Sequence, residues 1–118
     1  MIFTKAIQIV KPNELKIIDM PKPQIDEVNN VLVKIKASGI CGSDVGIYHG
    51  TNAAATYPRL IGHEIVGEIV EAGANVKTRK LGERVIIDQV VACGHCYACR
   101  KSRPNVCYNL QVRGVHID

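Results

Sequence analysis

The sequence predicts a mainly β fold, a small barrel or sandwich, for three reasons. Short segments rich in Val and Ile follow one another and are separated by turns that contain Gly or Pro. No segment carries a long apolar repeat of 3.6 residues, so no long amphipathic helix is expected. The chain has 118 residues, of which 47% are hydrophobic and 22% charged, which suits one globular domain and is short for two. With no Trp and one Phe, its core must be aliphatic.

The first half of the chain predicts three strands and one short helix. We expect strands at residues 6–10, 15–20 and 31–37, a helix at 45–49 and a loop at 53–58. Pro12 and Asn13 predict the turn between the first two strands, and Pro21 rules out a longer central strand after the second. Ser43 or Asp44 is expected to be the N-cap of the helix, because both side chains can accept a backbone hydrogen bond.

The second half predicts three more strands around a loop that is rich in cysteine. We expect these strands at residues 65–71, 84–91 and 112–117. Turns are expected at 72–75 and 81–83, where glycines interrupt the apolar pattern. The end of the chain at Asp118 carries no closing polar tail, and we expect the sequence to be part of a longer protein.

Charge and hydropathy exclude several classes of protein. The net charge is +4, and the nearest basic cluster, Arg100, Lys101 and Arg103, lacks interleaved aromatic residues, so a solvated loop is favoured over a nucleic-acid surface. No apolar run reaches the roughly 20 residues that span a membrane. The N-terminus does not resemble a signal peptide. We therefore expect a cytoplasmic protein whose five cysteines stay reduced.

Four cysteines are concentrated in one short stretch, which predicts a metal site. The stretch reads C-G-H-C-Y-A-C-R-K-S-R-P-N-V-C and contains Cys93, Cys96, Cys99 and Cys107. Four thiolates at this spacing favour tetrahedral Zn²⁺. A disulfide is disfavoured in the cytoplasm and a redox C-x-x-C lacks its βαβ setting, whereas spacing alone leaves an iron centre open. Four protein donors leave no position for substrate, so the site is expected to be structural. His95 is expected at the surface.

A second set of polar residues surrounds the remaining cysteine. Taken alone, Cys41 is typical of buried filler, and His63 next to Glu64 is typical of a protein surface. A thiolate and an imidazole are also zinc ligands, and Ser43 and Asp44 add the polar groups that a catalytic site requires. Glu64 is a further polar group of this kind.

The motifs, in this order, resemble those of zinc-containing alcohol dehydrogenases of the medium-chain dehydrogenase/reductase superfamily. Gly62-His63-Glu64-Ile65-Val66-Gly67 with Gly73 is similar to the family signature, and Gly39-Ile40-Cys41-Gly42-Ser43-Asp44 is similar to the catalytic cysteine motif. The four-cysteine stretch is similar to the structural-zinc lobe. The resemblance implies one N-terminal GroES-like domain over residues 1–118, a partly open β-barrel with short helices and a zinc lobe at about 90–110.

The resemblance also implies roles for the second set of residues. Cys41 and His63 would bind a catalytic zinc, and Glu64 would lie beside the metal or bind it, as in polyol-type members. Because strand alternation points adjacent residues to opposite faces, Glu64 would reach the metal only through an irregular backbone, which Gly62 makes feasible. Ser43 would relay a proton from the substrate hydroxyl, and Asp44 would orient the imidazole of His63. Many members carry a histidine five residues after the catalytic cysteine. Here that position is Gly46, and we expect His49 or a water molecule to take over the relay.

The implied activity is oxidation of a secondary alcohol, with hydride transfer from a zinc-bound alkoxide to NAD or NADP. The substrate is expected to be a small alcohol, polyol or sugar acid, with a weak lean toward the polyol branch, and the enzyme a homodimer or homotetramer. No G-x-G-x-x-G occurs, so the dinucleotide-binding domain is absent from this chain and the isolated chain is expected to be inactive. The rival interpretation is a non-enzymatic zinc-knuckle module that binds nucleic acid or protein. It leaves Cys41 and His63 unexplained.

Overall fold

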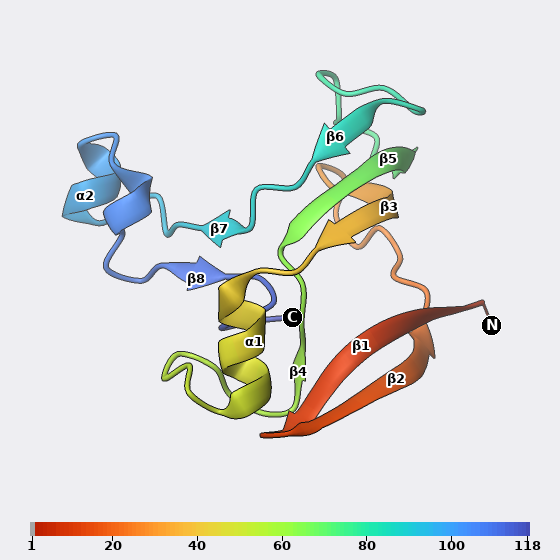
Figure 1. The fold of residues 1–118 in the computed structure, drawn as a ribbon. Coiled ribbons are helices and arrows are strands. Elements are labelled where there is room, and N and C mark those ends of the chain that lie inside the picture. Colours follow the sequence, from red (N-terminus) through yellow and green to blue (C-terminus); the bar gives the residue numbers. More distant parts are fainter. Residues whose placement is uncertain (1) are drawn as a thin grey trace.

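Three small antiparallel sheets form the framework of the protein. The computed structural model describes residues 2–118. The strands are β1 (Phe3–Lys11), β2 (Glu14–Pro21), β3 (Val31–Gly39), β4 (Arg59–Leu60), β5 (Glu64–Ala72), β6 (Arg84–Ile86), β7 (Val90–Val91) and β8 (Gln111–Val112) (Figure 1). The helices are α1 (Gly42–His49), α2 (Tyr97–Arg100) and the 3-10 helix η1 (Pro104–Val106). The mainly β prediction is confirmed.

The strand order separates the sheets into an N-terminal, a central and a C-terminal unit. The orders are β2-β1-β4, β3-β5-β6 and β7-β8. β1 and β2 form a hairpin whose turn includes Asn13 at a φ of 64°. The sheets remain open rather than closing into one barrel, and the β7–β8 ribbon carries α2 and η1 away from the other two sheets (Figure 1).

The pairing of β3 with β5 brings distant parts of the chain together. The antiparallel register ends with Gly39, the last residue of β3, opposite Glu64, the first residue of β5. Cys41 follows β3 and His63 precedes β5, so both lie at the same end of the central sheet. The backbone pairing of two strands therefore juxtaposes the two short motifs that the sequence singles out.

The core is aliphatic, as the lack of aromatic residues predicts. Ile9 of β1, Ile47 of α1 and Val115 form a buried cluster, against which Tyr48 and Tyr57 pack. The hydroxyl of Tyr57 donates a hydrogen bond to the carbonyl of Ile47, 2.5 Å away. α1 is thereby fixed between the N-terminal sheet and the segment after β8. No helix among residues 2–118 has the length and hydropathy needed to cross a bilayer.

The predicted start of α1 is wrong. The helix begins at Gly42, and its N-cap is Cys41 rather than Ser43 or Asp44. Asp44 lies in the first turn, and its carboxylate accepts a hydrogen bond from the backbone N–H of Cys41 at 2.9 Å. The prediction that Asp44 takes part in capping holds, but Asp44 lies inside the helix. Its carboxylate reaches back to the N-cap residue instead of being the N-cap itself.

The strand predicted at 84–91 is wrong in its continuity. β6 belongs to the central sheet and β7 pairs with β8, so the chain changes sheets between them. Asp88 lies in that connection, and its carboxylate accepts a hydrogen bond from the N–H of Val90 at 2.9 Å. This local bond competes with the regular ladder of a continuous strand.

Three further differences concern short elements. The cysteine-rich segment contains α2 and η1 and is not only a loop. The strand predicted at 112–117 stops at Val112, and a turn follows in which Gly114 has a φ of 77°. The two-residue strand β4 has no sequence prediction, because two residues are too few to show an alternating pattern.

Two candidate metal centres

The four cysteines of the C-terminal ribbon form a single cluster, which we call the cysteine lobe. Their Sγ atoms all lie within 4.8 Å of one another. Cys96 is the N-cap of α2, Cys99 lies within that helix, and Cys107 follows η1. Cys93 precedes a turn in which Gly94 has a φ of 79°, a conformation that glycine adopts without strain.

The geometry of the cysteine lobe fits zinc. The Sγ atom of Cys107 lies 3.5 Å from that of Cys93 and 3.9 Å from that of Cys96. A tetrahedron with Zn–S bonds of about 2.3 Å has an edge of about 3.8 Å. All four cysteines are free, so the disulfide alternative has no support in this structure. The donor set and its separations match a closed, structural site.

Electrostatics explain why the cysteine lobe needs a cation. The backbone N–H groups of His95 and Cys96 lower the pKa of the Cys93 thiol to about 6. Burial raises the pKa of the Cys99 thiol to about 12. The thiols are too close for all of them to ionise in the absence of a positive charge, and a bound metal deprotonates its thiol ligands outright.

The other polar side chains of the lobe point to solvent. His95 is exposed, and its Nδ1 atom lies 2.9 Å from the carbonyl oxygen of its neighbour Cys93. Arg100, Lys101 and Arg103 are exposed as well. The expectation that His95 is a surface residue rather than a fifth donor agrees with this placement.

Cys41, His63 and Glu64 form the second cluster, which we call the open cluster. Their donor atoms lie within 4.8 Å of one another. Gly62 has a φ of 107°, outside the range of regular strands, and the chain between β4 and β5 is irregular there. This irregularity turns the two consecutive side chains of His63 and Glu64 toward the same cysteine, as predicted from the glycine.

The carboxylate of Asp44 connects two members of the open cluster. One oxygen, Oδ2, accepts the hydrogen bond from the backbone of Cys41. The other, Oδ1, lies 3.4 Å from Nδ1 of His63. Asp44 and His63 are 5% and 7% exposed, and neither of these two facing atoms has a hydrogen-bond partner among residues 2–118.

This arrangement fits a metal bound to the other ring nitrogen. A carboxylate that faces Nδ1 keeps the proton on that atom and leaves the lone pair of Nε2 for a cation, an arrangement common among metal-bound histidines. A thiolate, an imidazole and a carboxylate are all zinc ligands, and together they provide one donor fewer than a closed tetrahedron. The open cluster is therefore chemically suited to a site with a free position.

The two predicted proton carriers occupy opposite ends of α1. Oγ of Ser43 lies 3.2 Å from Nε2 of His63, within the open cluster. His49 is exposed, and its Nδ1 lies 3.2 Å from Oδ1 of Asn13 in the β1–β2 turn. His49 is six positions after Ser43 in the helix, which corresponds to about 9 Å along a helix axis. The structure thus places Ser43 with the predicted ligands and His49 away from them.

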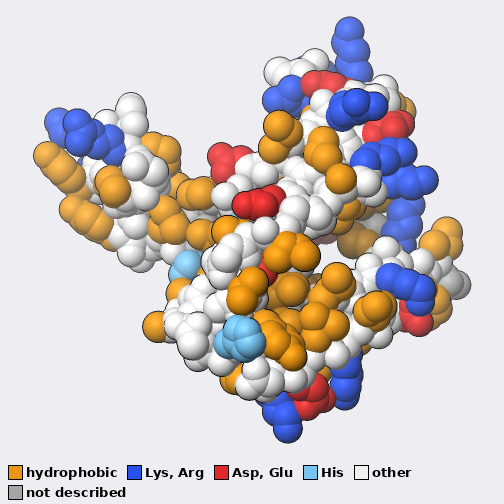
Figure 2. Space-filling view, in the orientation of Figure 1, with side chains coloured by type: hydrophobic (Ala, Val, Ile, Leu, Met, Phe, Trp, Pro, Cys, Tyr) orange, Lys and Arg blue, Asp and Glu red, His pale blue; other side chains and the backbone are white. Residues whose placement is uncertain are grey.

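An apolar groove borders the open cluster. It has a volume of about 370 Å³ and lies between β1 and α1, with Asp44 and Gly62 at its edge. Figure 2 shows hydrophobic side chains gathered over this part of the molecule. The apolar lining residues are Ile7, Ile9, Leu15, Ile40, Val45, Tyr48 and Ile61. Tyr48 both lines the groove and packs on the core.

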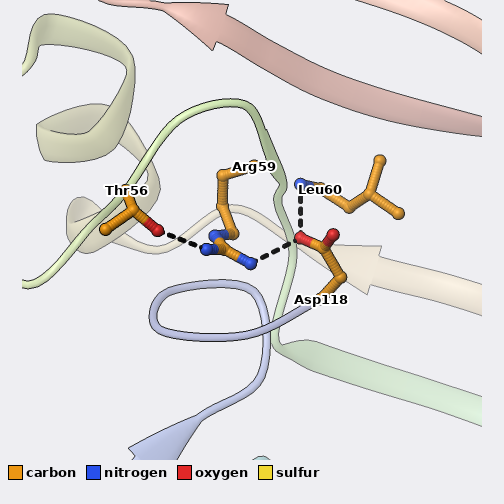
Figure 3. Close-up of polar contacts among 4 residues, drawn as sticks. All are labelled: Thr56, Arg59, Leu60 and Asp118. Carbon is orange, nitrogen blue, oxygen red and sulfur yellow. Dashed lines mark hydrogen bonds and ion pairs between the residues drawn. The ribbon is translucent and has the colours of Figure 1, made fainter.

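Arg59 holds the segment that leads to His63. Its guanidinium is 8% exposed and donates hydrogen bonds to Asp118 at 2.7 Å and to Thr56 at 2.5 Å (Figure 3). The same carboxylate oxygen of Asp118 accepts the backbone N–H of Leu60 at 3.0 Å. Sequence reasoning missed these residues. The available signal was an arginine in an otherwise apolar approach to the His-Glu pair.

Comparison with known proteins identifies the family of this chain. The family described as Alcohol dehydrogenase GroES-like domain matches residues 27–116. An uncharacterized zinc-type alcohol dehydrogenase-like protein from Haemophilus influenzae is 48% identical over 115 residues, which cover 97% of this chain and 33% of that protein. L-galactonate-5-dehydrogenase from Escherichia coli K12 is 46% identical over 90 residues, covering 76% of this chain and 26% of the enzyme.

A known crystal structure has the same fold as this chain. The structure described as a short chain alcohol dehydrogenase (rspB) from Escherichia coli CFT073, complexed with NADH, superimposes with a TM-score of 0.88 at 50% identity. The match covers 98% of this chain and 33% of that one. The GroES-like prediction is therefore confirmed, and the chain spans about a third of the length of the proteins that it matches.

Proposed function

The chain belongs to the alcohol dehydrogenase GroES-like domain family, and from that premise we propose that it is the N-terminal catalytic domain of a zinc-dependent alcohol or polyol dehydrogenase. In this proposal residues 1–118 are one domain, the cysteine lobe covers about 90–110, and a dinucleotide-binding domain lies outside this chain. The observation that carries the proposal is the buried carboxylate of Asp44, which contacts both the backbone of Cys41 and the ring of His63.

Zinc has two proposed positions. The cysteine lobe holds a structural ion through four thiolates. Cys41, His63 and Glu64 hold the catalytic ion, and in the isolated domain Glu64 and water complete its coordination. Zinc at an open position supplies Lewis acidity, which lowers the pKa of a coordinated hydroxyl group.

The residues of this chain then orient the reaction and carry the proton. Asp44 fixes the ring of His63, so that Nε2 faces the reacting centre. The hydroxyl of Ser43, 3.2 Å from that nitrogen, is placed to accept the proton of the substrate hydroxyl. The sequence left His49 or water as the next carrier. The separation along α1 and the contact of His49 with Asn13 favour water.

The proposed substrate is a secondary alcohol within a polyol or sugar acid, and the proposed hydride acceptor is NAD or NADP. Two observations support these classes: one relative is named L-galactonate-5-dehydrogenase, and the matching crystal structure contains NADH. The complete enzyme is proposed to be a homodimer or homotetramer. The rival zinc-knuckle module does not account for a buried Asp44–His63 pair outside the lobe.

A screen of the complete protein tests the proposal. Small alcohols, polyols and sugar acids are offered with NAD⁺ and NADP⁺, and formation of the reduced nicotinamide is followed by absorbance. We expect zinc-dependent oxidation that a Cys41→Ser variant lacks. The isolated 118-residue chain is expected to retain one zinc firmly and to show no turnover. Two zinc ions that survive a strong chelator in the isolated chain would contradict this account of the open cluster.

The same protein preparation also tests the rival interpretation, a non-enzymatic zinc-knuckle module. A nucleic-acid-binding module would show affinity for DNA or RNA that falls steeply with salt, because phosphate contacts release counterions. We expect no such binding, since the lobe carries only three Lys and Arg residues, Arg100, Lys101 and Arg103.

A further inference from the structure

We propose that Gly39 is a positioning residue for Glu64: the missing side chain at residue 39 provides the space in which the carboxylate of Glu64 turns toward Cys41 and His63. The inference rests on the proposed function of the open cluster as a metal site. It assigns a role to a glycine that neither binds metal nor touches the reacting atoms.

The register of the central sheet places the two residues face to face. Gly39 and Glu64 are directly paired in the β3–β5 ladder. Residues opposite each other in an antiparallel pair present their side chains on the same face, with Cβ atoms about 5 Å apart. A Cβ atom built on Gly39 would lie 2.5 Å from Oε2 of Glu64 and 3.2 Å from its Cβ. The carboxylate is thus folded back across the position that any other residue at 39 would fill.

The position of the Glu64 carboxylate near Cys41 and His63 depends on the space above Gly39 and not on a polar contact. Glu64 is exposed, and within residues 2–118 its carboxylate makes no hydrogen bond or ion pair in this structure. Its donor oxygen nevertheless lies within 4.8 Å of the donor atoms of Cys41 and His63. Because no partner fixes this rotamer, the room above Gly39 decides whether the carboxylate reaches the cluster.

Backbone conformation does not by itself require glycine at this position. Gly39 is a strand residue and is not among the glycines with positive φ. An alanine is therefore compatible with the main chain, and its cost arises from contact with Glu64. Gly42 is a matched comparison, since it lies on the other side of Cys41 and has no positive φ. Apart from its chain neighbours and the backbone of its own helix, a Cβ atom at Gly42 would lie within 4 Å of nothing among residues 2–118.

The test measures zinc affinity of the complete protein by competition with a chelator. The release phase that a Cys41→Ser variant lacks is assigned to the open cluster. We expect Gly39→Ala to weaken that phase about 10- to 100-fold, the size of effect seen when groups that orient metal ligands are lost. Gly42→Ala is expected to leave it unchanged, and both variants are expected to keep the zinc of the cysteine lobe.

A double variant separates steric positioning from a general effect on the strand. Glu64→Ala removes the carboxylate that lies 2.5 Å from a Cβ atom at residue 39 and leaves only the Cβ atom at 3.2 Å. Adding Gly39→Ala to it is therefore expected to cause no further loss of affinity. Equal affinities of the Gly39→Ala and wild-type proteins would overturn the inference, as would an equal loss with and without the Glu64 side chain. If Gly39→Ala alone fails to fold, the double variant is expected to fold, and an unfolded double variant overturns the inference.

The wild-type protein separates this inference from the proposed function. A complete protein that binds zinc only in the cysteine lobe overturns both. A protein that binds two zinc ions and tolerates Gly39→Ala overturns only the role of Gly39.

Discussion

The cysteine lobe and the open cluster bring metal-binding side chains together in different ways. The lobe takes all its donors from one continuous segment, Cys93–Cys107, which includes two single-turn helices. The open cluster takes its donors from two segments that only the pairing of β3 with β5 brings together. We therefore expect the lobe to depend on its metal for order, and the geometry of the open cluster to be set by the fold.

The two clusters also differ in the number of metal-coordination positions that remain free. Four thiolates within 4.8 Å complete a tetrahedron, so the lobe has no room for a substrate. The open cluster has three donors and a buried carboxylate beside its histidine, and that carboxylate also lines the apolar groove. These differences are the basis for proposing a structural role for the lobe and a catalytic role for the open cluster.

Loss of one lobe thiolate is expected to have the largest effect. Zinc binding to such a site contributes about 10 kcal/mol or more of folding free energy, so a Cys99→Ser variant should lose the ion and the order of residues 93–107. Zinc content and amide hydrogen exchange measure the two changes. His95→Ala is the control, because its ring points to solvent. Unchanged exchange in the cysteine variant would show that the lobe folds without metal.

Removal of the buried imidazole is expected to lower activity strongly without loss of zinc from the cysteine lobe. In the complete protein, His63→Ala should lower kcat/KM by about 1,000-fold, because Lewis-acid stabilisation is worth several kcal/mol. The lobe zinc should remain, as measured by mass spectrometry. Activity close to that of the wild type would place the chemistry elsewhere.

Replacement of the carboxylate behind that imidazole is expected to have an intermediate effect. Asp44→Asn keeps the size of the side chain but removes the charge that faces Nδ1 of His63. We expect a 10- to 100-fold loss of metal affinity at the open cluster, measured by chelator competition. Asp19→Asn, which alters only an exposed ion pair with Lys5, serves as the control and should match the wild type.

Disruption of the contacts of Arg59 is expected to cost stability rather than chemistry. Arg59→Met removes the hydrogen bonds to Thr56 and Asp118 and should lower the free energy of unfolding by about 1–3 kcal/mol. Arg79→Met breaks an exposed pair with Glu83, for which at most about 1 kcal/mol is expected. Denaturant titration of both variants tests the difference, and equal losses would contradict the importance of burial.

The smallest effect is expected at His49. Its distance from Ser43 along α1 favours water as the second proton carrier, so His49→Ala should leave the pH dependence of kcat/KM unchanged. A shifted profile would instead assign the relay to the imidazole.

Local spacing allowed the sequence to predict more about the cysteine lobe than about the open cluster. The positions of Cys93, Cys96, Cys99 and Cys107 place four thiolates within reach of one ion in any compact turn. The predicted strands at the N-terminus also agree with β1, β2 and β3, because alternation of side chains is a property of neighbours. The prediction of one continuous strand at 84–91 was wrong because alternation between neighbours does not show where the chain passes from one sheet to another.

By itself, the sequence determined the residue types, their order and the mainly β character of this domain. Tertiary structure decided what those residues do together. Asp44 reaches both Cys41 and His63 only because α1 begins at Gly42, and Glu64 turns toward them above Gly39 only because β3 and β5 pair in one register. Contacts between residues far apart in the chain depend on strand register and on packing space, and neither is encoded in local spacing.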